Sequence, residues 1–100
     1  MVKYKVVLYP KAFRDMYDIY NYIAINKVEP TTAKRQTERI WEAIHTLENM
    51  PESHQDRLVG RFSNKGYKQL IIDNYIAIYK VNELNKTVSV VTVQYGGRNI

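Results

Sequence analysis

The hydrophobic residues of this chain recur first with a period of two residues, then with a period of about 3.6 residues, and then again with a period of two. Tyr4, Val6 and Leu8 alternate with Lys3, Lys5 and Val7, which predicts a strand over residues 3–9 with one buried face, ended by Pro10. Two stretches with helical spacing follow, and three alternating stretches come after them. A chain with this order of periods is expected to fold as an α+β protein.

The first helix is predicted over residues 12–25. Asp15 and Asp18 lie near its start, where a negative charge favours the positive end of the helix dipole. Its predicted apolar stripe consists of Phe13, Met16, Tyr17, Tyr20, Ile23 and Ala24.

The second helix is predicted over residues 32–48, with Thr31 or Thr32 as its cap and Pro51 beyond its end. Because the connection between the two helices is short, they are expected to pack antiparallel. The predicted buried stripe of the second helix consists of Ala33, Ile40, Ala43 or Ile44, and Leu47.

The second half of the chain is predicted to contain three strands, over residues 67–72, 75–81 and 87–95. Asp73 and Asn74 tolerate a positive φ, so the first two of these strands are expected to form a tight hairpin. Residues 51–66 read as an irregular connection with a short extended piece at 58–62.

The predicted fold is therefore an N-terminal strand, a two-helix antiparallel hairpin and a three-stranded antiparallel meander, in a single domain over residues 1–100. Both helices are expected on one face of the sheet, and both faces are partly apolar, so the free face offers a concave surface to a partner. In the strand predicted over residues 75–81, alternation places Tyr75, Ala77, Tyr79 and Val81 on one face of the sheet and Ile76, Ile78 and Lys80 on the other. In the last strand it separates Val88, Val90 and Thr92 from Val91, Val93 and Tyr95.

The charge and the cysteine count limit the chemistry. The chain has no cysteine, so disulfides, thiolate nucleophiles and cysteine-bound zinc are excluded. No apolar stretch approaches the roughly 20 residues needed to cross a bilayer, and no signal peptide is visible, so we expect a cytoplasmic protein. The net charge of +5 favours a polyanion or an acidic protein as partner, with an ordinary solvated basic surface as the alternative.

The candidate site residues are cations and one tyrosine. His45 and His54 belong to no spaced pair, no metal-ligand spacing is present, and the helical glutamates are expected to be surface charges, so neither a metal nor a cofactor is expected. If the last three strands are neighbours, one edge of the sheet gathers several cations beside a tyrosine. These residues are Arg57, Arg61, Lys65, Lys68, Tyr95 and Arg98, of which Arg61, Lys68, Tyr95 and Arg98 are the candidate catalytic set.

The layout and several short motifs resemble the RelE/ParE family of bacterial toxins over nearly the whole chain. The motifs are YPKA at 9–12, DIYNYI at 18–23, LENMP at 47–51, YIAIYKV at 75–81 and VTVQYGGR at 91–98. The resemblance implies the growth-inhibiting toxin of a type II toxin-antitoxin, or plasmid stabilisation, module, neutralised by an acidic antitoxin.

The family is divided by target. One branch poisons DNA gyrase, and the other cleaves mRNA on the ribosome without a metal, using a basic residue in strand two or three, a terminal basic residue and an aromatic residue. Lys68, Tyr95 and Arg98 match that pattern, with Arg61 as an added phosphate ligand. Ile76 stands where family members commonly have arginine, and Ile72 also replaces a cation. The resemblance therefore slightly favours a gyrase poison, with the ribosome-dependent nuclease as the alternative and an inactive binding module as a second alternative.

Overall fold

The computed structural model describes residues 3–26, 29–49, 51, 54, 56–57 and 66–96. The helical part comprises α1 (Pro10–Asn21), a π-helical turn (Tyr22–Asn26), α2 (Pro30–His45) and a 3-10 turn (Thr46–Glu48). The strands are β1 (Lys5–Leu8), β2 (Lys68–Ile72), β3 (Tyr75–Asn82) and β4 (Thr87–Tyr95). The predicted piece at 58–62 lies outside the described residues.

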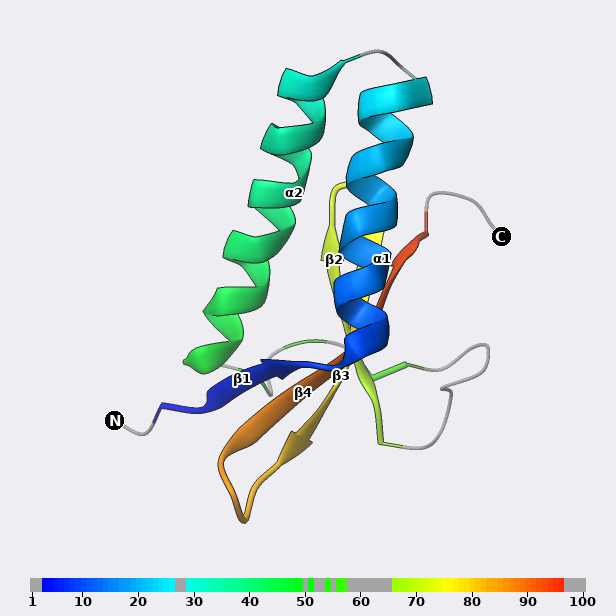
Figure 1. Ribbon diagram of the computed structural model, residues 1–100. Coiled ribbons are helices and arrows are strands. Elements are labelled where there is room, and N and C mark those ends of the chain that lie inside the picture. The colour runs from blue at the N-terminus through cyan, green and yellow to red at the C-terminus, as the bar shows by residue number, and fades with distance from the viewer. Residues whose placement is uncertain are drawn as a thin grey trace.

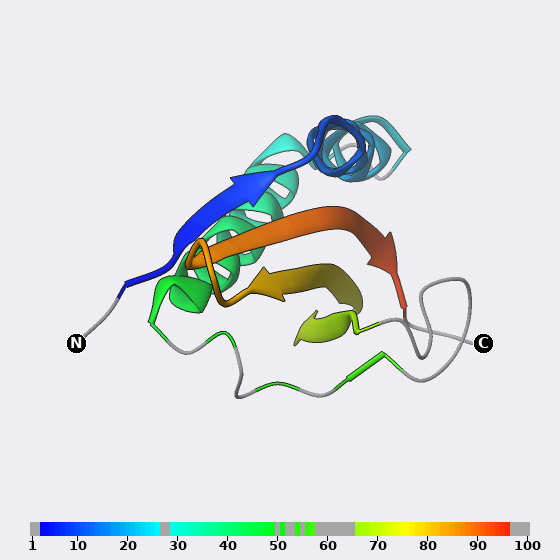
Figure 2. The ribbon, with the colours of Figure 1, turned by 90° about the horizontal axis from the view of Figure 1, so that it is seen from below.

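The four strands form one sheet in the order β1-β4-β3-β2 (Figures 1 and 2). The last three strands are the predicted antiparallel meander, and the two helices form the predicted antiparallel hairpin on one side of the sheet. β1 pairs in parallel with β4, with Lys5 opposite Thr87 and Leu8 opposite Val90. A parallel pair needs a long crossover between its strands, and here the helical hairpin and the β2–β3 hairpin lie between them in the chain. The predicted α+β fold class is confirmed, and the parallel pairing of the first strand with β4 adds to the prediction.

The buried stripe of α1 contains Met16 and Ile23, as predicted, but otherwise it lies one position earlier than the predicted stripe. The residues that face the core are Ala12 and Met16, followed by Ile19 and Ile23, whereas Phe13, Tyr17 and Tyr20 are exposed. The two stripes have the same helical spacing and lie about 100° apart around the axis, so periodicity fits both of them. The small Ala12 side chain is fully buried where α1 approaches the sheet, and the bulky aromatic side chains lie outside.

The prediction for α2 was right about its buried face and wrong about its start. Ala33, Ile40, Ile44 and Leu47 are buried as expected. The helix begins at Pro30 with Glu29 as its N-cap, because proline is well suited to the first helical position. Thr32 caps nothing through its own hydroxyl, which instead donates a hydrogen bond of 2.8 Å to the Glu29 carboxylate.

A β-bulge changes which residues of β4 face the helices. The pairing with β3 steps from Ile78–Thr92 to Tyr79–Val90, so Val91 is an extra residue in β4. A bulge shifts the alternation by one position for the residues that follow it. The predicted division of β4 is therefore wrong beyond Val90, and the β4 residues in the helix-facing core are Val88, Val90 and Val93.

Asp15 joins α1 to the edge of β4. Its carboxylate accepts hydrogen bonds from the Thr92 hydroxyl and from the Val93 N–H, the latter at 3.0 Å. Lys11 donates to the same carboxylate at 3.0 Å and to the Thr92 hydroxyl at 3.2 Å. β1 ends at Leu8, so among the described residues this part of β4 has a neighbouring strand, β3, on one side only, and Asp15 supplies the acceptor that is missing on the other side. Because α1 begins at Pro10, two residues before the predicted start, neither Asp15 nor Asp18 lies in its first turn, and the predicted role of the two carboxylates at the helix dipole is wrong.

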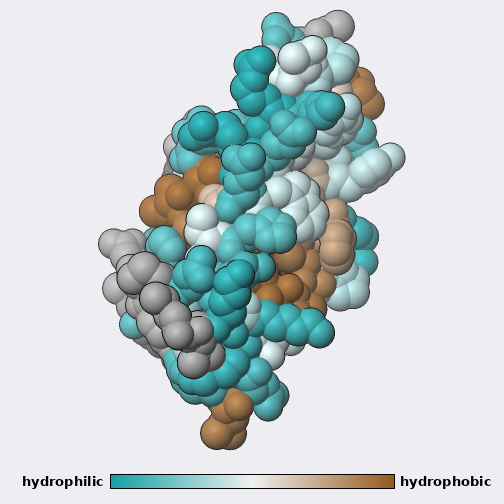
Figure 3. Space-filling view, turned by 90° about the vertical axis from the view of Figure 1, so that its left-hand side faces the viewer, coloured by the Kyte–Doolittle hydropathy of each residue, from teal (hydrophilic) through white to brown (hydrophobic). Residues whose placement is uncertain are grey.

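The surface on the α2 side is largely hydrophilic, with apolar side chains in small patches (Figure 3). Among the described helices, none combines the length and the apolar character that crossing a membrane requires.

Candidate functional site

Two of the four predicted catalytic residues, Lys68 and Tyr95, are among the described residues, and Arg61 and Arg98 lie outside them. Lys68 pairs with Tyr79 in β3, and Tyr95 pairs with Tyr75 at the other end of that strand. Four residue steps along β3 correspond to about 13 Å, and β3 itself lies between the two strands concerned. Lys68 and Tyr95 therefore do not converge at one edge, contrary to the expectation.

The Lys68 ammonium is held by the segment that follows α2. Its Nζ lies 2.9 Å from a carboxylate oxygen of Asp56 and 3.3 Å from the carbonyl oxygen of His54. The side chain is only 17% exposed, because Lys68 lies on the helix-facing side of the edge strand with Leu70 and Ile72. An ammonium neutralised by a carboxylate attracts a phosphate less than a free one does, which weakens the predicted role of Lys68 in charge stabilisation.

Tyr95, by contrast, borders a cavity of about 580 Å³ between the helical hairpin and the end of the sheet. Its ring contacts that of Tyr75 edge-on, with centroids 5.7 Å apart. Burial raises the pKa of Tyr75, and the neighbouring Tyr95 and Tyr22 raise it further. The helices contribute Asp18, Tyr22, Thr32 and Gln36 to the lining.

An ion pair next to the cavity fixes α2 to the β2–β3 turn. Arg39 donates two hydrogen bonds, of 2.8 and 2.9 Å, to the Asp73 carboxylate, and Gln36 donates a third of 3.0 Å. Asp73 has a φ of 56°, as the predicted tight turn requires. Arg39 and Gln36 together lower the pKa of Asp73 to about 2.

Because of the Arg39–Asp73 ion pair, we expect the protein to lose stability in acid. The pKa of Asp73 in the unfolded chain is about 3.9, so its charged form stabilises the fold above about pH 4, and this contribution disappears as the pH falls towards 2. Asp73→Asn keeps a residue that tolerates positive φ but removes the titrating group. We expect its melting temperature to be lower than that of the wild type at pH 7 and to converge with it near about pH 2, measured by circular dichroism.

Asp18→Asn is the control, because Asp18 makes no ion pair among the described residues. Its melting curves should follow those of the wild type over the same range. A constant difference between Asp73→Asn and the wild type from pH 7 to pH 2 would contradict the assignment.

The sheet face turned away from the helices carries a second hollow, of about 440 Å³. Lys80 lies over the ring of Tyr67 here, with its Nζ 5.1 Å from the centroid, and Ser89 and Val91 also line the hollow. Alternation in β3 places Lys80 on this face, and that pattern was visible in the sequence. The value of Lys80 as a cation beside an aromatic ring was nevertheless missed, because the strand register, which brings Lys80 next to Tyr67, is not visible in the sequence.

Gly96 packs directly against Ile76 at the end of the sheet. The Gly96 N–H donates a hydrogen bond of 2.8 Å to the carbonyl of Asn74. A Cβ on residue 96 would lie 2.3 Å from Cδ1 and 2.7 Å from Cγ1 of Ile76. Ile76, where the resemblance stated above led us to expect an arginine, thus fits a position where its neighbour has no side chain.

Gly96→Ala is therefore expected to lower the free energy of unfolding by about 1–3 kcal/mol, because the added methyl group displaces the Ile76 side chain. Urea denaturation measures the loss. In an Ile76→Ala background the same change should cost less, since both close atoms are gone. An equal cost in both backgrounds would show that the contact with Ile76 is not the cause.

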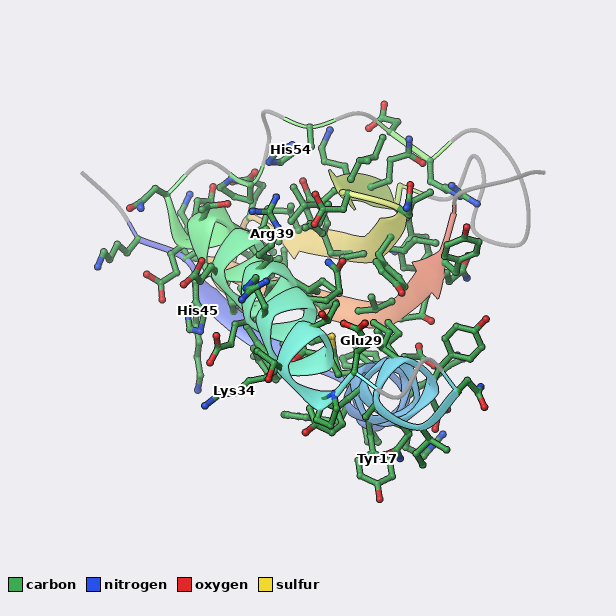
Figure 4. The ribbon with its side chains drawn as sticks, turned by 90° about the horizontal axis from the view of Figure 1, so that it is seen from above. Tyr17, Glu29, Lys34, Arg39, His45 and His54 are labelled. Atoms are coloured by element: carbon green, nitrogen blue, oxygen red, sulfur yellow. The ribbon has the colours of Figure 1, made fainter. Side chains whose placement is uncertain are left out.

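The two histidines lie apart from both hollows. His45 is exposed near Trp41, and His54 lies edge-on to the ring of Tyr79, with centroids 6.4 Å apart. Figure 4 shows Tyr17 on α1 pointing away from the molecule, on the opposite side from His54. In the described part of the chain, no group of three His, Cys, Asp or Glu side chains has a geometry that fits a metal ion.

Solved structures share this fold at low sequence identity. The chromosomal ParDE toxin-antitoxin system from P. aeruginosa contains a chain that is 18% identical, with a TM-score of 0.74 over 93% of this chain and 96% of that one. A chain of the RelBE2 toxin-antitoxin complex from Mycobacterium tuberculosis is 19% identical, with a TM-score of 0.65 over 98% of this chain and 97% of that one. A chain of the RelE-RelB complex from Pyrococcus horikoshii OT3 is 19% identical, with a TM-score of 0.63 over 98% of this chain and 100% of that one. These likenesses define the class of fold, a small α+β fold that the chain shares with these proteins.

The family follows from the sequence itself. Residues 6–100 match the family model described as the ParE toxin of the type II toxin-antitoxin system, parDE. A search of curated proteins by sequence finds no match. The chain belongs to the RelE/ParE family and is the toxin of a type II toxin-antitoxin system, as its motifs predicted.

Proposed function

We propose that this toxin blocks growth in the cytoplasm by poisoning DNA gyrase. The observation that carries the proposal is the poverty of available cations in the described sheet. Ile72 is buried in the core and Ile76 packs against Gly96, so neither position holds a phosphate. Lys68 is bound by Asp56, and Lys80 is the one other cation in the described strands β2, β3 and β4. Phosphoryl transfer depends on several preorganised charges around the reacting group.

The match to the ParE family model supports the same branch. A gyrase poison acts by binding another enzyme, so it requires a docking surface and no reactive centre of its own. The exposed apolar side chains suit such a surface; Tyr17 is 68% exposed and Leu84, between β3 and β4, is 95% exposed.

The test measures both targets with one preparation. Purified toxin is added to a gyrase supercoiling assay and to a translating extract in which the mRNA is followed on a gel. We expect supercoiling to stop and cleaved DNA complexes to accumulate, while the mRNA stays intact. Cut mRNA with unchanged supercoiling would replace the proposal with the ribosome-dependent nuclease. Normal growth on expression of the toxin alone would indicate an inactive binding module.

The nuclease alternative has its own signature. The substrate's 2'-hydroxyl would lose its proton to water and attack the adjacent phosphorus. The bond from phosphorus to the 5'-oxygen of the next nucleotide would break, and that oxygen would leave as a hydroxyl after taking up a proton, with Arg61 and Arg98 stabilising the developing charge. Arg98→Ala would then reduce cleavage about 100-fold, the effect of removing one electrostatic donor. An unchanged rate of cleavage would exclude Arg98 from the chemistry.

We also propose that an acidic antitoxin neutralises the toxin. The related ParDE and RelBE structures are toxin-antitoxin assemblies, and the net charge of +5 favours a partner rich in carboxylates. An amphipathic segment would place its acidic side chains on the basic surface and its apolar side chains on the partly apolar sheet face. Co-expression with the neighbouring reading frame followed by purification should yield a complex. Recovery of the toxin alone would count against this partner.

A further inference from the structure

The cavity beside Tyr95 has a composition that differs from the basic character of the whole chain. Three tyrosines, Tyr22, Tyr75 and Tyr95, line it from α1's π-helical end, from β3 and from β4. Asp18 is the one charged residue in the lining, and no described lysine or arginine borders the cavity. A site with aromatic rings and a carboxylate therefore lies within a protein of net charge +5.

The rings are arranged so that a ligand can reach them. The side chains of Tyr22 and Tyr95 are 55% and 63% exposed, whereas Tyr75 is half-buried and meets Tyr95 edge-on. The face of an aromatic ring carries a partial negative charge, which attracts a cation within about 6 Å of its centroid. Rings around a cavity thus favour an organic cation over an anion.

The polar groups of the lining also suit a hydrogen-bond donor. In the described part of the chain, the Asp18 carboxylate has no cationic partner. Gln36 donates its amide hydrogen to Asp73, which leaves its carbonyl oxygen as an acceptor. The Arg39–Asp73 pair beside it holds α2 against the β2–β3 turn, so the lining is supported on both sides.

We propose that this cavity binds a guanidinium group, with the tyrosine rings packed against the cation and Asp18 as its counter-ion. A guanidinium is planar, stacks on aromatic rings and donates two parallel hydrogen bonds to a carboxylate, so it fits these residues better than a compact ammonium. The group reaches the site either as a free alkylguanidine or as an arginine side chain of a protein. This cavity is separate from the hollow beside Lys80 on the other face of the sheet. The proposal holds whether the toxin acts on gyrase or on the ribosome.

Titration of the full chain by two-dimensional NMR tests the proposal. The probes are n-butylguanidinium and n-butylurea, which have nearly the same shape but differ in charge. We expect the guanidinium to shift the amide signals of Tyr22, Gln36 and Tyr95, with an affinity at least about tenfold above that of the urea. Equal affinities, or shifts confined to other parts of the chain, would overturn the proposal.

Variants locate the binding and identify its cause. Asp18→Asn should weaken it about fivefold or more, and Tyr22→Leu should weaken it where Tyr22→Phe does not, because phenylalanine keeps the ring. Tyr17→Leu is the matched control, since Tyr17 lies on α1 and points away from the molecule (Figure 4). The spectra themselves report whether each variant is folded. Equal weakening by Tyr17→Leu would contradict the assignment.

A blocked Gly-Arg-Gly peptide and its citrulline counterpart distinguish the two sources of the group. Tighter binding of the arginine peptide than of butylguanidinium assigns the site to a protein partner, and weaker binding assigns it to a free guanidine. Identical binding of the arginine and citrulline peptides, together with identical binding of guanidinium and urea, would exclude a cation site.

Discussion

Replacing Tyr79 with alanine is expected to lower the free energy of unfolding by about 4 kcal/mol, as truncation of a buried aromatic side chain does. Tyr79 is fully buried in β3 and belongs to the core beneath the helices. Its hydroxyl also donates a hydrogen bond of 2.6 Å to the carbonyl of Pro51, in the segment that follows α2. The loss therefore combines an empty volume in the core with an unpaired carbonyl group. Urea denaturation followed by circular dichroism measures it.

Tyr79→Phe separates these two contributions. It keeps the ring and removes only the hydroxyl, so we expect a loss of about 1–2 kcal/mol. Tyr17→Ala is the control, because this tyrosine is 68% exposed and should change stability by no more than about 0.5 kcal/mol. Similar losses for Tyr79→Ala and Tyr17→Ala would mean that the core does not depend on Tyr79.

The second large effect is expected for Asp15→Ala, at about 3 kcal/mol. The substitution leaves the fully buried Thr92 hydroxyl and the Val93 N–H without their acceptor, and it removes the ion pair with Lys11. Hydrogen bonds to a charged group contribute about 1.5–3 kcal/mol each, and a buried donor without a partner adds a desolvation cost. Thermal and urea unfolding of the variant give the value.

Two comparisons test the cause. Asp15→Asn keeps one acceptor oxygen and should lose less than Asp15→Ala. Asp18→Ala, at the next carboxylate of the same helix, should be close to neutral because Asp18 makes no ion pair among the described residues. If Asp15→Ala and Asp18→Ala have equal effects, the link between α1 and β4 does not stabilise the fold.

Much of the fold could be predicted because the periods of the hydrophobic residues differ so clearly between its parts. The alternation in β3 and the buried face of α2 were predicted correctly. The hydrophobic residues around Tyr79 follow only the strand period, and those around Ile40 follow only the helical period. The face of α1 was not, because Met16 belongs to two overlapping stripes of equal period. The β4 bulge at Val91 also escaped prediction, since pairing between strands, and no local signal, decides where an extra residue is accommodated.

The candidate site was harder to predict than the fold. Sequence order alone placed Lys68 and Tyr95 in one meander, but the distance between them depends on β3, which lies between their strands, and on the register, which sets them four pairs apart along β3. The partner of Lys68, Asp56, comes from an irregular segment whose path no periodicity describes. Tyr22 and Asp18 reach the cavity because the helical hairpin extends past the end of the sheet (Figure 1), a feature of three-dimensional packing.

The parallel pairing of β1 with β4 has a consequence for the time at which this toxin forms. Lys5 pairs with Thr87, so the first strand can join the sheet only after the last strand has been synthesised. Contacts between such distant parts of a chain form late and slowly. During translation the nascent polypeptide therefore carries an incomplete sheet until β4 has left the ribosome.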